Sequence, residues 1–162
     1  MAFELREHTA DIAVEATGET LEETVAAVAD GLAAASCNTD EIPPDTGDRF
    51  DLTVAAESRE ALLFEYLDEL IYLRDVRLEL PVENRVRIRD QRPEAGDADD
   101  EKGTDDADDR WTLEGSARGV PLSEIDAREV KAVTYSEMRL EAVGGESGSE
   151  TAGWEAYVVF DV

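Results

Sequence analysis

Apolar and polar residues alternate in several short stretches of this chain, and each stretch predicts a β-strand. The pattern places every second side chain on the same face of a strand. In the stretch from Val130 to Ala142, it puts the even-numbered residues on one face. We expect about seven strands, at Phe3 to Glu7, Ile12 to Ala16, Phe50 to Ala56, Val76 to Leu80 continuing at Val86 and Ile88, Trp111 to Gly115, Val130 to Ala142 and Trp154 to Val162.

Two other stretches have apolar residues at helical spacing. Leu21 to about Ser36 follows Thr20, which with Glu23 matches a capping box. Arg59 to about Arg74 follows Ser58, a residue type that caps helices well. Two helices among hairpin-linked strands predict an α+β fold. We expect a single two-layer domain over residues 1–162, with the helices covering one face of a mostly antiparallel or mixed sheet.

The segment from Glu94 to Asp109 differs from the rest of the chain. It holds nine acidic residues, one lysine and no large apolar side chain. Such a composition cannot bury enough apolar surface to fold. We therefore expect a flexible, solvated loop at about 94–109, with capture of a basic partner as the alternative interpretation.

The charge of the chain excludes several classes of function. With 15 basic and 41 acidic residues, its net charge is −26 at pH 7. Direct binding of nucleic acid or of an anionic membrane is not expected, since both carry negative charge. Arginine outnumbers lysine by 13 to 2. An acidic, lysine-poor surface is typical of proteins that work in concentrated salt, where ions screen the self-repulsion. We therefore expect a halophilic source.

The rare residue types narrow the chemistry further. One histidine, His8, and one cysteine, Cys37, cannot build a zinc finger or an iron–sulfur site. The chain also lacks a run of about 20 apolar residues or a signal-peptide pattern. A lone cysteine fits a reducing compartment. We expect a cytoplasmic, soluble protein with no membrane contact.

The last strand predicts the most informative cluster. Alternation places Phe160 and Val162 on one face of this strand and Asp161 on the other face. If the strand is ordered, the carboxylate of Val162 lies beside that of Asp161, and two fixed negative groups favour a compensating cation. Asp11, immediately before the second strand, supplies a third acid. Oxygen ligands of this kind suit calcium, magnesium or manganese.

Three other residues have plain structural interpretations beside functional ones. His8, near a strand end, fits a hydrogen-bonded structural residue better than a catalyst, since no Ser–Asp arrangement accompanies it. Cys37 is expected to fill space at a helix end. Lys131 is the one lysine outside the acidic segment, so it is either an ordinary surface charge or a required ammonium group.

Three motifs, in order, resemble those of the archease family. They are Glu7-His8-Thr9-Ala10-Asp11-Ile12, the run from Lys131 through Ala132-Val133-Thr134 to Tyr135, and the closing Phe160-Asp161-Val162. The Ala-rich and Leu-rich helices between them fit the same family. The resemblance covers most of the chain except the acidic segment.

This resemblance implies a function that composition alone does not. It implies an accessory protein, not itself an enzyme, that activates an RtcB-type tRNA-splicing ligase by promoting ligase guanylylation and multiple turnover. It also implies a divalent cation bound by Asp11, Asp161 and Val162. Lys131, and with less support His8, become candidates for ligase activation.

Three alternatives stay open. The first is a chaperone-like modulator of a tRNA methyltransferase. The second is a small metal-dependent hydrolase that uses Asp11 and Asp161, against which stands the lack of an evident general base beyond His8. The third is a plain acidic domain without a metal.

Overall fold

The computed structural model describes residues 2–7, 11–90, 110–144 and 151–162. The expected α+β class is confirmed, whereas the acidic segment 94–109 and His8 lie outside the described residues. Within these described ranges, the connections include the short 3-10 helices η1 (Thr39–Glu41) and η4 (Leu122–Glu124). The main elements are β1 (Ala2–Glu7), β2 (Asp11–Gly18), α1 (Leu21–Ser36), β3 (Asp48–Ala56), α2 (Arg59–Arg77), β4 (Glu79–Asp90), β5 (Trp111–Pro121), β6 (Ala132–Gly144) and β7 (Thr151–Asp161).

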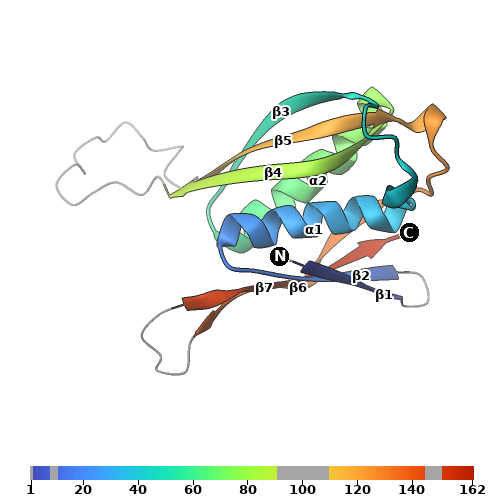
Figure 1. Cartoon of the computed structure of the whole chain (residues 1–162). Coiled ribbons are helices and arrows are strands. Elements are labelled where there is room, and N and C mark those ends of the chain that lie inside the picture. The colour runs from blue at the N-terminus through green and yellow to red at the C-terminus, as the bar shows by residue number, and fades with distance from the viewer. Residues whose placement is uncertain (1, 8–10, 91–109, 145–150) are drawn as a thin grey trace.

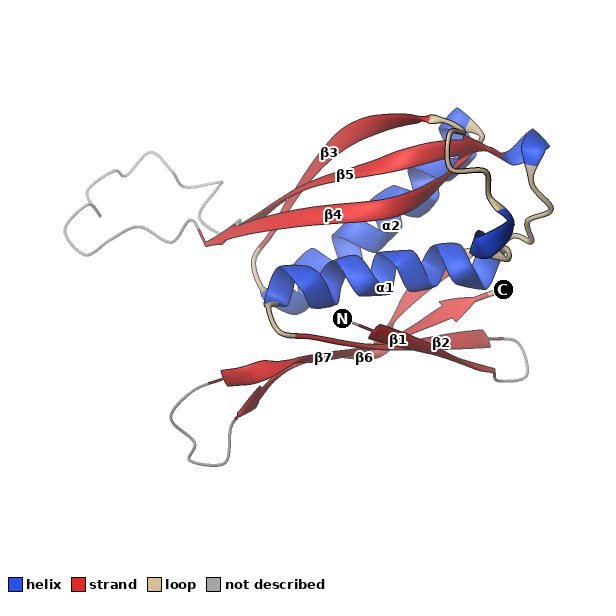
Figure 2. Cartoon of the chain, viewed as in Figure 1, coloured by secondary structure: helices blue, strands red, loops and turns tan. Residues whose placement is uncertain are grey.

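The strands form two antiparallel sheets instead of the single sheet that we expected. Sheet A has the order β1-β2-β7-β6, and sheet B has the order β3-β5-β4. Both helices lie between the sheets and contact strands of each, so the domain has three layers where we expected two (Figures 1 and 2). Alternation identifies strands but not their partners. Eleven of the sixteen residues of α1 are buried, which is typical of a helix with packed layers on both sides.

The helix starts follow the sequence signals, whereas the end of α2 does not. The Thr20 side chain accepts from the Glu23 amide at 3.0 Å, and the Ser58 side chain accepts from the Ala61 amide at 3.0 Å. Helix α2 continues to Arg77, beyond the expected end at Arg74. Its C-cap, Leu78, has a left-handed conformation with φ 57°. The expected strand at Val76 to Leu78 is therefore wrong, because these residues end the helix.

Bulges change the facing of side chains in two strands. The pieces expected at Leu80 and Val86 form one strand, β4, with an irregularity between Val82 and Arg85. In β6, the pairing with β7 shifts between Thr134 and Arg139. Inserted residues reverse which parity faces the core. Val133 and Leu140 are consequently both buried, and the expectation of one even-numbered face in this strand is wrong.

The core fills the two spaces between the layers. Tyr66, Leu67 and Leu70 of α2 and Phe160 of β7 are almost completely buried there. At the start of α2, the Arg59 guanidinium lies 5.6 Å from the ring centroid of Trp111 in sheet B and 5.0 Å from that of Trp154 in sheet A. Among the helices described here, none is long and apolar enough to cross a membrane.

Candidate functional site

Asp11 and Asp161 lie directly opposite each other where β2 and β7 pair. Their neighbours Ile12 and Phe160 are buried against the helices. Alternation therefore turns both aspartates to the outer face of sheet A, as the sequence predicted for Asp161. Directly opposed residues of antiparallel strands have Cβ atoms about 5 Å apart. Two carboxylates at this spacing repel each other unless a cation or hydrogen-bond donors compensate them.

Lys131 and Val162 lie at the same end of sheet A. The Lys131 amide donates to the Asp161 carbonyl at 2.7 Å, and the next residue, Ala132, is the β6 partner of Asp161. Lys131 is exposed, whereas Val162 is half-buried and packs against the core. The structure thus places Lys131, which the sequence analysis considered separately, at the same sheet end as Asp11, Asp161 and Val162.

The donor set at this end fits a hard cation only with help from the main chain. Within residues 11–90, 110–144 and 151–162, no group of three or more His, Cys, Asp or Glu side chains is placed to hold a metal ion. Asp11 and Asp161 supply two carboxylates on one face. Carbonyl or terminal carboxylate oxygens and water complete such shells for calcium and magnesium.

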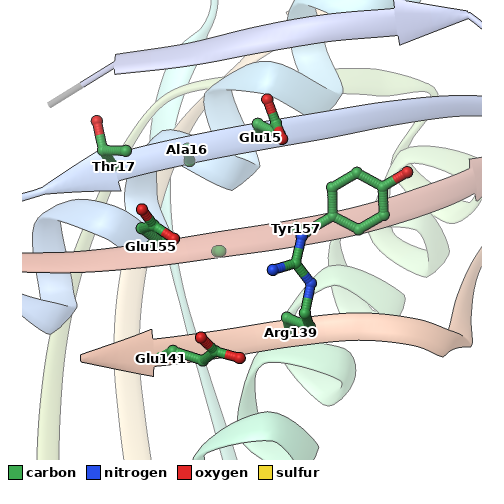
Figure 3. A pocket seen from close by; sticks show the side chains of 8 residues that line it. Glu15, Ala16, Thr17, Arg139, Glu141, Glu155 and Tyr157 are labelled. Atoms are coloured by element: carbon green, nitrogen blue, oxygen red, sulfur yellow. The ribbon is translucent and has the colours of Figure 1, made fainter. Parts of the chain in front are cut away.

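A second acidic cluster on the same face was missed by the sequence analysis. Glu15 and Thr17 of β2, Glu155 and Tyr157 of β7, and Glu141 and Arg139 of β6 line a hollow of about 130 Å³ (Figure 3). The Arg139 guanidinium lies 5.1 Å from the Tyr157 ring centroid. The signal was the alternation of acids along β2 and β7, which becomes a cluster only when these strands are paired.

A buried polar network on the other side of α1 has a structural role. Asp30 accepts from the Asn84 amide at 3.0 Å and from its side-chain Nδ2 at 2.9 Å. Burial raises the pKa of the Asp30 carboxyl. Tyr66 donates its hydroxyl to Asn84 Oδ1 at 3.4 Å. These bonds join both helices to the irregular part of β4, which would otherwise leave buried polar groups unpaired.

Cys37 remains a residue without an assigned role in chemistry. It is half-buried beside the smaller core cluster that contains Ile42 and Val120. Burial raises the pKa of its thiol, with the Glu41 carboxylate adding to the effect. A protonated thiol is a poor nucleophile, so the space-filling interpretation fits better than a reactive one.

Comparisons with known proteins agree on one family. The family model described as "Archease protein family (MTH1598/TM1083)" matches residues 3–162. The archease of Pyrococcus furiosus is 31% identical over 99% of this chain and 98% of its own. The archease of Methanosarcina mazei is 31% identical over 99% of this chain and 95% of its own. That of Thermococcus kodakarensis is 34% identical over 86% and 87%, respectively.

Two solved structures resemble this fold. The solution structure of Methanobacterium thermoautotrophicum protein 1598 has a TM-score of 0.68 at 25% identity and covers 99% of this chain and 98% of its own. The crystal structure of a Thermotoga maritima archease, described as a possible chaperone, has a TM-score of 0.56 at 22% identity, covering 97% and 94%. The latter likeness is one of fold alone. The sequence matches and the fold together show that this chain belongs to the archease protein family.

Proposed function

We propose that this protein is an accessory protein that activates an RtcB-type RNA ligase in tRNA splicing. In this proposal it promotes guanylylation of the ligase and multiple turnover, and the ligase carries out the joining chemistry. The proposal is supported by family membership and, in the structure, by one observation above all. Asp11 and Asp161, distant in sequence, are direct partners at one end of sheet A.

The same proposal assigns a divalent cation to this sheet end. Asp11, Asp161 and the carboxylate of Val162 would hold it, with calcium, magnesium and manganese all compatible with oxygen ligands. When bound, the cation supplies a positive centre that can attract phosphate or carboxylate oxygens. The aspartates compensate its charge, and the backbone bond from Lys131 to Asp161 orders the strand that carries one of them.

Lys131 has a separate role in the proposal. The backbone amide of Lys131 donates to the Asp161 carbonyl, whereas the Lys131 side chain is exposed. A compact, mobile ammonium suits contact with the ligase or with its bound nucleotide. His8 is close to Asp11 in sequence and is a weaker candidate for the same contact.

The test is multiple-turnover RNA joining by an RtcB-type ligase from the same cell type, in high salt, with and without this protein. The proposal predicts more product per ligase in its presence, and loss of the gain with Asp11→Asn. An active ligase that gains nothing from the folded protein would exclude the activator role. Charge supports the choice of a protein partner over RNA, because the chain has a net charge of −26 at pH 7.

A second candidate is a chaperone-like modulator of a tRNA methyltransferase. It is favoured by the description of the Thermotoga maritima archease as a possible chaperone. Its test is the oligomeric state of the methyltransferase, measured by sedimentation with and without this protein. A shift that Asp11→Asn leaves intact would favour the modulator and separate it from the cation site.

A further inference from the structure

One peptide group is held from both sides next to the candidate cation site. Its N–H, on Lys131, donates to the Asp161 carbonyl at 2.7 Å. Its carbonyl, on Val130, accepts from Nη1 of Arg74 at 2.8 Å. The Val130–Lys131 peptide group therefore connects the last turns of α2 to β7. Polarisation of a peptide group by a cationic donor at its oxygen strengthens the bond made by its N–H.

Among the arginines whose burial the structure describes, Arg74 is the buried one. Only 7% of its side chain is exposed. Its Nε and Nη2 donate to Asp75 Oδ1 at 3.1 and 2.8 Å, which leaves Nη1 aimed at Val130. A buried guanidinium is tolerated only when its charge and its donors are satisfied. Asp75, itself exposed, supplies the charge and sets the orientation.

The segment that leads into this peptide group has a second anchor. The Arg128 amide donates to the Ser36 carbonyl at 2.7 Å, and its Nε donates to the Ala35 carbonyl at 3.0 Å. Val130 is completely buried. Arg128 fixes the segment to the end of α1, and Arg74 fixes it to the end of α2. Lys131 is thus presented from a segment held at two points.

We propose that Arg74 is a positioning residue of the candidate cation site. Its guanidinium holds the Val130–Lys131 peptide group so that the Lys131 amide bonds to the Asp161 carbonyl, which places the Asp161 side chain opposite Asp11. Helix α2 is thereby coupled to the cation site through one peptide group. The part of this inference that concerns the cation rests on the proposed function, whereas the part that concerns the backbone does not.

The experiment compares Arg74→Met with Arg77→Met in the full chain. Arg77 serves as the control. It lies three residues further along the same helix, and its half-exposed side chain pairs with Glu79 at 3.2 Å. Asp75→Ala removes the partner of Arg74 at an exposed position and guards against a folding failure of Arg74→Met. Two quantities are measured: hydrogen exchange of the Lys131 amide by NMR, and the dissociation constants of Ca²⁺ and Mn²⁺.

The proposal predicts that Arg74→Met speeds exchange of the Lys131 amide about tenfold or more, as loss of a charge-assisted hydrogen bond implies. It predicts a dissociation constant about tenfold higher for the cations, the size typical of lost support to a ligand. Asp75→Ala shifts both in the same direction by less, and Arg77→Met shifts neither. Hydrogen exchange of the β5 amides is the control for global stability. Faster exchange there as well would identify a general loss of stability in the variant.

Unchanged Lys131 exchange in either Arg74→Met or Asp75→Ala, with the fold intact, would overturn the proposal. Faster exchange with an unchanged cation constant would overturn its cation part. If the wild-type chain binds neither ion, the cation site fails, while the exchange result still decides whether Arg74 positions the backbone. A failure of ligase activation alone would count against the proposed function and not against Arg74.

Discussion

The outer faces of the two sheets carry different charges, although both belong to the same acidic chain. On sheet A, like charges stand opposite each other: Asp11 faces Asp161, and Glu141 faces Glu155. On sheet B, acids meet arginines. Glu83 bonds to Arg118 at 2.9 Å.

On sheet B, arginine side chains form ion pairs with the acidic side chains. The strands of sheet B carry five arginines among six acids, Arg49, Arg85, Arg87, Arg89 and Arg118 with Asp48, Asp51, Glu79, Glu83, Asp90 and Glu114. The Arg118 guanidinium lowers the pKa of the Glu83 carboxyl. The acids opposed on sheet A thus belong to a different arrangement, one in which a divalent cation is a natural complement.

The largest expected effect is on the affinity for a divalent cation, which we expect to depend on an aspartate of sheet A and not on one of sheet B. Asp161→Asn removes one of the paired carboxylates, so we expect the dissociation constant of Ca²⁺ or Mn²⁺ to rise at least about tenfold. Asp51→Asn makes the same change on sheet B and is the matched control, with no expected effect. Calorimetry measures both. Equal constants for wild type and Asp161→Asn would remove Asp161 from the site.

The next effect concerns stability. Arg118 donates to Glu83 and to the carbonyls of Pro43 and Thr46, whereas Arg139 on sheet A lies over the Tyr157 ring. Arg118→Ala should therefore lower the free energy of unfolding by about 2 kcal/mol, and Arg139→Ala by about 0.5 kcal/mol. Urea unfolding in one fixed salt concentration measures both. A larger loss at Arg139 would reverse our interpretation of the faces.

A smaller effect tests the like charges directly. Glu141→Arg places a positive charge directly opposite Glu155. It should stabilise the fold by about 0.5 kcal/mol in low salt. Glu114→Arg, facing Arg87 on sheet B, makes the reverse change and should destabilise by a similar amount. Both effects should fade in molar salt because of screening. Thermal unfolding at low and high salt measures them, and persistence in molar salt would contradict an electrostatic cause.

The smallest effect is a dependence of stability on pH. The pKa of Asp30 is raised in the fold. Its contribution to the free energy of unfolding is therefore fully present below the unfolded pKa of about 3.9, and it is lost as the pH rises through the folded pKa. Asp30→Asn should remove that loss, within about 1 kcal/mol. Glu83 has a lowered pKa, so its contribution is lost as the pH falls instead. Urea unfolding from pH 3 to 7 tests the two opposite signs, using Glu83→Gln alongside.

Local features of this fold could be predicted from the sequence, and non-local ones could not. The caps at Thr20 and Ser58 depend on residues within one turn, and the structure confirms both. The pairing of strands into two sheets depends on contacts across the whole chain. The bulge in β6 reversed the facing of its residues without any Gly or Pro to mark it between Thr134 and Arg139.

The candidate site divides in the same way. Alternation predicted the facing of Asp161. The position of Asp11 before the second strand marked it as a third acid, and Lys131 was marked as the one lysine outside the acidic segment. The bond from Arg74 to Val130 joins residues 56 positions apart, and nothing in their local sequence marks it. Arg74 stands in a helix that periodicity describes as amphipathic, where a charged residue is expected to be exposed.

The most direct test of the central claim is the rate at which an RtcB-type ligase becomes guanylylated in the presence of this protein. The assay compares wild type, Asp161→Asn and Asp51→Asn in high salt with a divalent cation. Our account predicts acceleration by wild type and by Asp51→Asn, and little or none by Asp161→Asn. Equal acceleration by all three would show that the paired aspartates at the end of sheet A are not the functional site.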